Sequence, residues 1–219
     1  MSNHSSSSDE FSSALEEHAL LFGIRLSQQT SARLRDYYEQ VISWNTRLHL
    51  VAPCAPAEFA TRHVLESLLA LPYLVEGACV VDIGSGAGLP IIPCLIVRPD
   101  LRATLIEASQ KKTVFLREAL RSVEAHSRAK IIAERFEETP EPEADALTCR
   151  ALDRFTELFP KLFEWSSGVK TLLLFGGESL REQLEKSVSN YQAIRVPESE
   201  RRFLFIVSHR TQAHGQQKK

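Results

Sequence analysis

The stretch that most constrains how this chain can fold is "VVDIGSGAGLP", residues 80–90. It carries three glycines, Gly84, Gly86 and Gly88, directly behind an apolar run that contains Asp82. Glycine has no Cβ, so it accepts positive φ values and lets a ligand approach the backbone closely. An apolar strand, a glycine turn and the start of a helix together form a cradle for a nucleotide-containing ligand. The segment therefore predicts an α/β fold with a ligand site beyond the end of this strand.

The spacing of the glycines distinguishes between two kinds of ligand. A dinucleotide site requires G-x-G-x-x-G, whereas this turn is G-x-G-x-G and has Leu89 where the third glycine of that motif would stand. S-adenosylmethionine has no pyrophosphate for a helix N-terminus to hold, and its aminoacyl end can hydrogen-bond to the amides of a bare turn. The turn favours this methyl donor, and a plain tight turn in a NAD enzyme is the alternative.

Two carboxylates flank the turn in the predicted fold. Asp82 stands two residues before the first glycine, and Glu107 ends the next β-like run, about twenty residues after the turn. In a βαβ unit the ends of the first two strands lie side by side, so a carboxylate there can accept both hydroxyls of a ribose. We therefore predict that Asp82, Gly84, Gly86 and Glu107 bind the donor.

The order of apolar patterns predicts the fold class. From residue 12 to about 75, apolar residues recur at helical steps of three and four. Seven β-like runs follow, at 79–84, 103–108, 130–134, 144–150, 170–176, 191–196 and 201–209. Strands that alternate with helices form a parallel, doubly wound sheet, and the short "PESE" link before the last run requires an antiparallel pair. The sequence thus predicts a Rossmann-like class I S-adenosylmethionine-dependent methyltransferase fold, α/β, with seven mostly parallel strands.

The same patterns divide the chain into four parts. The serine-rich residues 1–12 are predicted to form a disordered tail. Residues 13–76 are predicted to form an N-terminal helical extension, residues 77–209 the methyltransferase domain, and residues 210–219 a flexible tail.

Two further strand ends point to the same crevice, because ligands bind beyond the carboxyl ends of parallel strands. Phe136 and Glu137 follow the third strand and are placed to flank an adenine, although Phe136 could equally anchor the core. Arg150 ends the fourth strand, where a guanidinium binds carboxylate or phosphate, and a surface salt bridge is its alternative role. Cys149 beside it could act as a covalent nucleophile, but a buried strand cysteine is usually inert.

Charge and composition exclude several other classes of protein. The net charge is −2, so no overall basic field calls for nucleic acid. Residues 111–130 nevertheless hold six basic side chains against two acidic ones, which form either a solvated helix or an RNA-facing patch. The four cysteines form no C-x-x-C pair and the histidines no ligand spacing, so no metal site is predicted. No apolar run is long enough to span a bilayer, and we expect a cytoplasmic protein.

Four segments, in order and spacing, resemble the bacterial 16S ribosomal RNA guanine-N7 methyltransferases, also called the glucose-inhibited division protein B or small subunit methyltransferase G family. They are "VISWNTRLHL", "TRHVLESL", "VDIGSGAGLPIIPCLIVRPD" and "TLIEASQKKTVFLREA", and the resemblance covers roughly residues 14–208. It implies methylation of N7 of one guanine, position 527, in 16S rRNA, with S-adenosylmethionine as the donor. The donor-binding positions of the family match Gly84, Leu89, Phe136, Glu137 and Arg150, and its ribose-binding acid falls on Glu107.

The implied chemistry needs no general base, because guanine N7 has an in-plane lone pair and no proton. We therefore assign no catalytic acid or base. The implied partner is 16S rRNA or the 30S particle, bound by a monomer through local cations, for which Lys111, Lys112, Arg201 and Arg202 are the candidates.

The chain departs from the family pattern at a few positions. It has His49 for a common asparagine, Glu66 for an aspartate, Gly176 for a lysine, and Arg201-Arg202 in place of an arginine–histidine pair. Two other functions therefore stay open. One is a methyltransferase of the same fold acting on a small molecule or protein, and the other is a catalytically inactive ribosome-binding relative.

Overall fold

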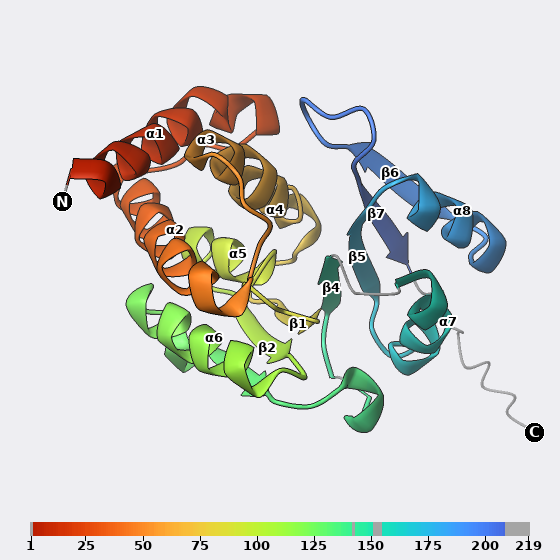
Figure 1. The fold of residues 1–219 in the computed structure, drawn as a ribbon. Helices are drawn as coiled ribbons and strands as arrows, with labels where there is room; N and C mark the ends of the chain where they lie inside the picture. The colour runs from red at the N-terminus through yellow and green to blue at the C-terminus, as the bar shows by residue number, and fades with distance from the viewer. Residues whose placement is uncertain (1, 142, 151–154, 209–219) are drawn as a thin grey trace, which may run out of the picture.

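The computed structural model describes residues 2–141, 143–150 and 155–208. Its centre is a seven-stranded sheet in the order β3-β2-β1-β4-β5-β7-β6 (Figure 1). The strands are β1 (Cys79–Ile83), β2 (Arg102–Ile106), β3 (Ala129–Ile132), β4 (Ala146–Arg150), β5 (Thr171–Gly176), β6 (Tyr191–Arg195) and β7 (Phe203–Ser208). Strands β1 to β5 are parallel, and β7 lies antiparallel to both β5 and β6. The predicted α/β class, the seven runs and the antiparallel final pair are confirmed.

Helical segments cover both faces of this sheet (Figure 1). Before β1 lie α1 (Ser2–His18), η1 (Ala19–Phe22), α2 (Gln28–Leu48), α3 (Pro56–Glu58), the π-helix η2 (Phe59–Leu65), α4 (Glu66–Leu68) and η3 (Leu71–Tyr73). Between and after the strands lie α5 (Ile91–Val97), α6 (Gln110–Ser122), η4 (His126–Arg128), η5 (Phe136–Glu138), α7 (Phe155–Trp165) and α8 (Glu178–Ser187).

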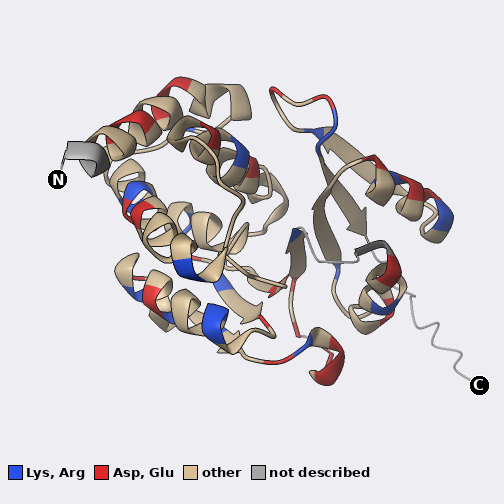
Figure 2. Ribbon diagram, in the orientation of Figure 1, with Lys and Arg blue, Asp and Glu red and all other residues tan. Residues whose placement is uncertain are grey.

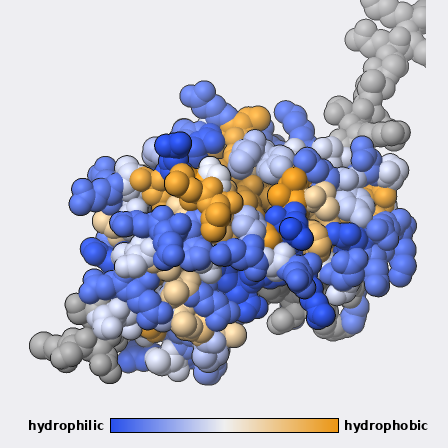
Figure 3. Space-filling view, turned by 90° about the horizontal axis from the view of Figure 1, so that it is seen from above, coloured by the Kyte–Doolittle hydropathy of each residue, from blue (hydrophilic) through white to orange (hydrophobic). Residues whose placement is uncertain are grey.

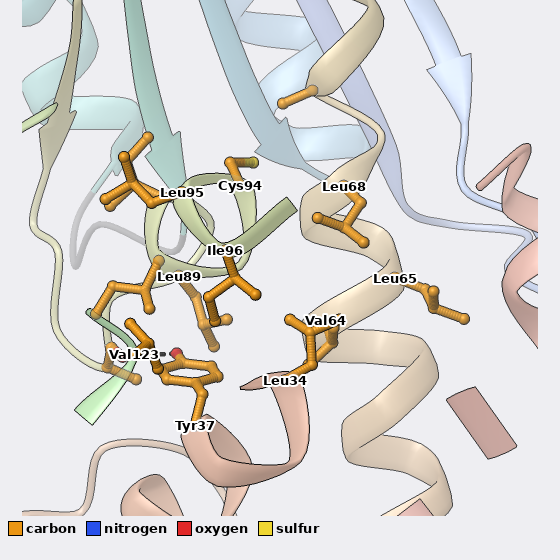
Figure 4. Packing of buried hydrophobic residues seen from close by; sticks show 14 of the residues in the cluster. Leu34, Tyr37, Val64, Leu65, Leu68, Leu89, Cys94, Leu95, Ile96 and Val123 are labelled. Atoms are coloured by element: carbon orange, nitrogen blue, oxygen red, sulfur yellow. Dashed lines mark hydrogen bonds between the residues drawn. The ribbon is translucent and has the colours of Figure 1, made fainter. Parts of the chain in front are cut away.

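The apolar core has two parts, one on each face of the sheet. Successive strand residues point to opposite faces, so Val80 belongs to one cluster and Val81 to the other. The first cluster joins β1 and β2 to α5, α6 and the helices before β1, as Figure 4 shows in close view. The second cluster joins the opposite face to α7 and α8. The helices that precede β1 therefore pack on the same core as α5 and α6.

The expectation of a disordered tail over residues 1–12 is wrong for the described residues 2–12. Helix α1 begins at Ser2, and Phe11 and Leu15, one helical turn apart, are fully buried. The Phe11 ring stacks on Tyr38 of α2, with 4.5 Å between the ring centroids. Serine-rich composition predicts weak helix propensity, but an apolar face that packs against neighbouring helices overrides propensity. The expected flexible tail, residues 210–219, lies outside the described residues.

Helix α2 ends in a way that accounts for His49. This residue has φ 47°, in the left-handed region, and its N–H bonds to the carbonyl of Asn45. Left-handed residues that close a helix are usually glycine or asparagine, and histidine also tolerates this conformation better than most residues. His49 therefore closes the helix, and the asparagine that is common at this position in the family suits the same left-handed conformation.

The outer surface is mostly hydrophilic. Figure 3 shows an apolar patch, in orange, on the face seen from above, surrounded by polar residues. Among the described residues, the large apolar side chains that are most exposed are Leu20, Leu21, Val75 and Val114. No helix within the described ranges is both long and apolar enough to cross a membrane.

Candidate functional site

The glycine turn connects β1 to α5 at the carboxyl end of the sheet. Gly84, Gly86 and Gly88 all have positive φ, of 66°, 51° and 84°. Gly84 and Gly86 are partly exposed, whereas the rest of residues 81–90 is buried. A Cβ on Gly88 would lie 2.3 Å from Cδ1 of Ile92, so this glycine lets the turn pack on its own helix. Close approach by a ligand is therefore left to Gly84 and Gly86.

Several amides of the turn are already bonded within the protein. The N–H groups of Gly84 and Ser85 both donate to the carbonyl of Ile106, at 2.9 and 3.2 Å. The N–H of Gly88 donates to the carbonyl of Ser85 at 2.5 Å. Leu89, the other predicted residue of the turn, is buried in the apolar cluster, so only its main chain can meet a ligand. The turn is thus rigid, and fewer of its amides are free for a ligand than the sequence predicts.

Glu107 lies beside the turn, as predicted. It follows β2 and is 8% exposed, and each of its carboxylate oxygens accepts a hydrogen bond from a backbone N–H. Its Oε2 accepts from the N–H of Gly86 at 2.8 Å, and its Oε1 accepts from the N–H of Ser109 at 2.7 Å. Each carboxylate oxygen keeps a further lone pair, so this fixed acid can still accept hydroxyl groups of a ribose.

Asp82 is the most unusual residue of the site. Its side chain is completely buried, and Oδ1 accepts a hydrogen bond from the hydroxyl of Thr148 at 2.6 Å. Its Oδ2 is also buried but has no hydrogen-bond partner among the described residues. Burial raises the pKa of this carboxyl to about 7, against the opposing effects of the Thr148 and Ser85 hydroxyls. A buried carboxylate oxygen without a partner is costly, and a cationic ligand group such as an ammonium would satisfy it.

Phe136 and Glu137 lie in η5, after β3. The Phe136 side chain is 4% exposed and packs edge-on against Trp165, with 5.5 Å between the ring centroids. The ring therefore anchors the core, which is the alternative interpretation of the sequence, and it offers no face for stacking on an adenine. Glu137 is exposed, so its carboxylate and the main chain of η5 are what this segment presents to a ligand.

Arg150 does not point into an open crevice. The side chain is 12% exposed and its guanidinium bonds to the segment that carries η2 and α4. It donates to the carbonyls of Arg62 and His63, at 2.8 and 3.3 Å, and approaches Nδ1 of His63 at 3.1 Å. Oε1 of Glu66 lies 3.7 Å away. The structure thus gives Arg150 the role of fastening residues 62–67 to the end of β4, in place of the exposed anion site expected from sequence.

Glu66 is the centre of this arrangement, which we call the Glu66 cluster: Arg62, His63, Glu66, Arg150 and Arg202. Glu66 is buried, and Nη1 of Arg202 lies 3.4 Å from its Oε2. Burial raises the pKa of Glu66, while the three arginines oppose that shift. Burial and the same arginines lower the pKa of His63 to about 3, so its ring is neutral. Sequence reasoning missed this cluster because its members are far apart in the chain, and "RHVLES" was the only local signal.

The four predicted RNA-contacting residues fall into two separate places. Lys111 is exposed and Lys112 half-buried in the first turn of α6, which begins close to Glu107. Arg201 is exposed just before β7, and Arg202 belongs to the Glu66 cluster. Figure 2 shows basic residues along α6, and acidic residues gathered in the segment that follows β3.

Comparison with known proteins identifies the family of the chain. The family model of rRNA small subunit methyltransferase G, or GidB, matches residues 30–208. A protein named ribosomal RNA small subunit methyltransferase G from Xanthomonas axonopodis pv. citri is 45% identical over 124 residues, 56% of this chain and 58% of its own. One of the same name from Anaeromyxobacter dehalogenans is 35% identical over 182 residues, 80% of this chain and 83% of its own.

The matched region spans about three-fifths of the length of the Xanthomonas relatives. Among solved structures, an RNA methyltransferase from Salinibacter ruber in complex with S-adenosyl-L-homocysteine is similar in fold. It has a TM-score of 0.54 and 16% identity, and the match covers 77% of this chain and all of that one. This likeness supports the class I methyltransferase fold. The family match over most of the chain goes further: this chain belongs to the rRNA small subunit methyltransferase G family.

Proposed function

We propose that the protein transfers a methyl group from S-adenosylmethionine to N7 of a guanine in 16S rRNA, position 527 by resemblance. We place it in the cytoplasm, as a monomer that acts on 16S rRNA or on the 30S particle. The observation that carries the proposal is the glycine turn with the unpartnered Oδ2 of Asp82 on one side and Glu107 on the other. Family membership supports the RNA substrate.

The residues around the turn fit the parts of the donor. The ammonium of its aminoacyl end would satisfy Oδ2 of Asp82, which has no hydrogen-bond partner among the described residues. Glu107 would accept the ribose hydroxyls, and the partly exposed backbone at Gly84 and Gly86 would let the donor lie close. Glu137 and the main chain of η5 would border the adenine. When bound, the donor supplies an electrophilic methyl group on a sulfonium.

Methylation of the acceptor requires the protein to align the reacting atoms more than to transfer a proton. Guanine N7 presents a lone pair and carries no proton, so we assign no general base. Holding nitrogen, methyl carbon and sulfur in line supplies most of the rate in such a reaction. A base splayed out of structured RNA is bound by stacking and polar contacts, and the phosphates by cations. We assign the phosphate contacts to Lys111, Lys112, Arg201 and Arg202.

One observation favours a second candidate, a methyltransferase of a small molecule or protein. Gly176, at the end of β5, stands where the family usually has a lysine, and a Cβ there would lie 2.6 Å from Cδ2 of Leu180. Gly176 has no side chain to carry the positive charge that the family lysine supplies at the end of β5. That end lies beside the end of β4 in the sheet.

Mapping of rRNA distinguishes the two candidates. We expect 16S rRNA from a deletion strain to lack a methyl group on one guanine, as seen by mass spectrometry of its fragments. Wild-type protein should restore it, and Asp82→Asn, which keeps the shape of the side chain, should not. An unchanged rRNA in the deletion strain, together with donor binding by the purified protein, would assign the activity to a small molecule or protein.

A further inference from the structure

Tyr37 connects the helices before β1 to the glycine turn. It lies in α2, and its hydroxyl donates a hydrogen bond of 2.7 Å to the carbonyl of Ala87, in the middle of the turn. The side chain is fully buried, and Ala87 is buried as well. Figure 4 shows the Tyr37 ring extending from α2 into the apolar cluster, toward Leu89. A residue 50 positions earlier in the sequence thus contacts the backbone of the proposed donor site.

The bonded carbonyl belongs to the part of the turn that most needs an external support. Ala87 lies between Gly86 and Gly88, which both have positive φ. Glycine loses more conformational freedom on ordering than any other residue, so a turn with this composition is costly to fix in one shape. The amide of the same peptide unit, the N–H of Gly88, bonds to the carbonyl of Ser85. Together with Tyr37, this bond holds the 87–88 peptide from both sides.

The hydroxyl of Tyr37 is chemically suited to this task. Burial raises the pKa of Tyr37, so the hydroxyl stays protonated and can donate at any physiological pH. The carbonyl of Ala87, in turn, would be a buried acceptor without a partner if the hydroxyl were removed. Leaving such a group unpaired costs more than the hydrogen bond itself contributes.

We propose that Tyr37 is a positioning residue for the methyl donor: it holds the 86–88 turn in the shape that receives the donor before the donor arrives. The inference rests on the proposed donor site. Preorganisation of this kind lowers the cost of ordering the turn on binding, so it strengthens affinity without touching the ligand. It also couples α2 to the donor site, so donor binding should in turn stabilise the packing of α2.

The neighbouring Tyr38 offers a matched control. It lies in the same helix and is also buried, with its ring stacked on Phe11. Its hydroxyl makes no hydrogen bond to another described residue. Tyr37→Phe and Tyr38→Phe therefore remove the same atom from adjacent buried rings, and only the first removes the bond to the turn.

Calorimetry with S-adenosylmethionine and S-adenosylhomocysteine tests the proposal. We expect Tyr37→Phe to raise the dissociation constant about three- to tenfold, and Tyr38→Phe to leave it unchanged. In turnover, KM for the donor should rise while kcat at saturating donor stays near the wild-type value. Equal donor affinity in wild type and Tyr37→Phe would overturn the inference. Failure of the wild type to bind the donor would instead overturn the proposed function.

Hydrogen exchange supplies a second test that needs no variant. If α2 and the turn are coupled through Tyr37, S-adenosylhomocysteine should slow amide exchange in residues 34–41 of α2 as well as in residues 84–92. Protection confined to the turn, with α2 unchanged, would contradict the coupling even if the tyrosine variant failed to fold.

Discussion

The carboxyl ends of β1 and β4 lie next to each other in the sheet, yet they differ in how their buried charged groups are paired. The end of β1 is a bare turn flanked by the carboxylates Asp82 and Glu107, and one buried carboxylate oxygen there has no partner among the described residues. At the end of β4, the guanidinium groups of Arg150 and Arg202 lie 3.7 and 3.4 Å from the buried carboxylate of Glu66. In the proposed function a ligand completes the first region, whereas the charges of the second region are largely paired within the protein itself.

This difference indicates which buried charge serves binding and which serves the fold. Oε2 of Glu66 also makes no hydrogen bond to a described residue, but the guanidinium of Arg202 lies 3.4 Å from it and supplies the opposite charge. For Asp82, in contrast, the group that bonds to Oδ1 is a neutral hydroxyl. Changes at Glu66 should therefore affect stability first, and changes at Asp82 and Glu107 should affect donor binding first.

The largest effect is expected from Glu66→Gln. This change leaves the guanidinium of Arg150 buried without its counter-ion, and breaking a buried ion pair from one side costs about 3–5 kcal/mol of unfolding free energy. Urea denaturation measures this, with Glu66→Asp as the control that keeps the charge. A Glu66→Gln protein as stable as the wild type would show that the cluster does not hold η2 to β4.

Glu107→Ala should weaken donor binding by about 1–3 kcal/mol, because it removes the acceptor for two ribose hydroxyls. Calorimetry measures the weakening, and Glu118→Ala, in the middle of α6, is the control. A 2′-deoxy analogue of the donor should bind the wild type with a similar reduction in affinity. If that analogue binds as tightly as the parent compound, Glu107 does not hold the ribose.

The raised pKa of Asp82 predicts how the free energy of unfolding of the donor-free protein depends on pH. The folded protein keeps the Asp82 proton up to about pH 7, whereas the unfolded chain releases it near pH 4. Between these values the folded state binds more protons, so the free energy of unfolding falls as pH rises, by at most about 1.4 kcal/mol per pH unit from this group. Asp82→Asn should flatten that part of the profile, and an identical profile in the variant would contradict the assignment.

The smallest effect concerns Lys111 and Lys112 of α6, the cations that we propose contact RNA. Reversing the charge of Lys111 and Lys112 together should lower the slope of log affinity against log salt by about 0.7–0.9 for each RNA phosphate that the variant no longer neutralises. Donor affinity should not change, and reversal at Arg117 and Arg121, further along the same helix, should matter less. If 30S particles are methylated equally well by the double variant at every salt concentration, RNA must approach past Arg62 and His63 instead.

The sequence was informative where the relevant residues are close together in the chain. The seven strands, the antiparallel final pair and the meeting of the glycine turn with Glu107 all follow from local patterns. The first part of α1, residues 2–12, was missed because polar serines masked the spacing of Phe11 and Leu15, which only packing against α2 reveals.

The rest depended on contacts between distant segments. No local pattern shows that Arg150 turns toward residues 62–67, or that Tyr37 reaches the carbonyl of Ala87. The motif places Gly88 beside Gly84 and Gly86 without showing its separate role, which is to make room for Ile92.

The most direct test of the donor site is calorimetric titration of S-adenosylmethionine into the wild type and Gly84→Val. Gly77→Val is the matched control, because Gly77 also has positive φ, of 70°, but precedes β1 at the opposite end of the strand. We expect one donor to bind to the wild type and to Gly77→Val, and none to Gly84→Val, with circular dichroism confirming that all three proteins are folded. Unchanged donor affinity in a folded Gly84→Val protein would contradict the placement of the donor at this turn.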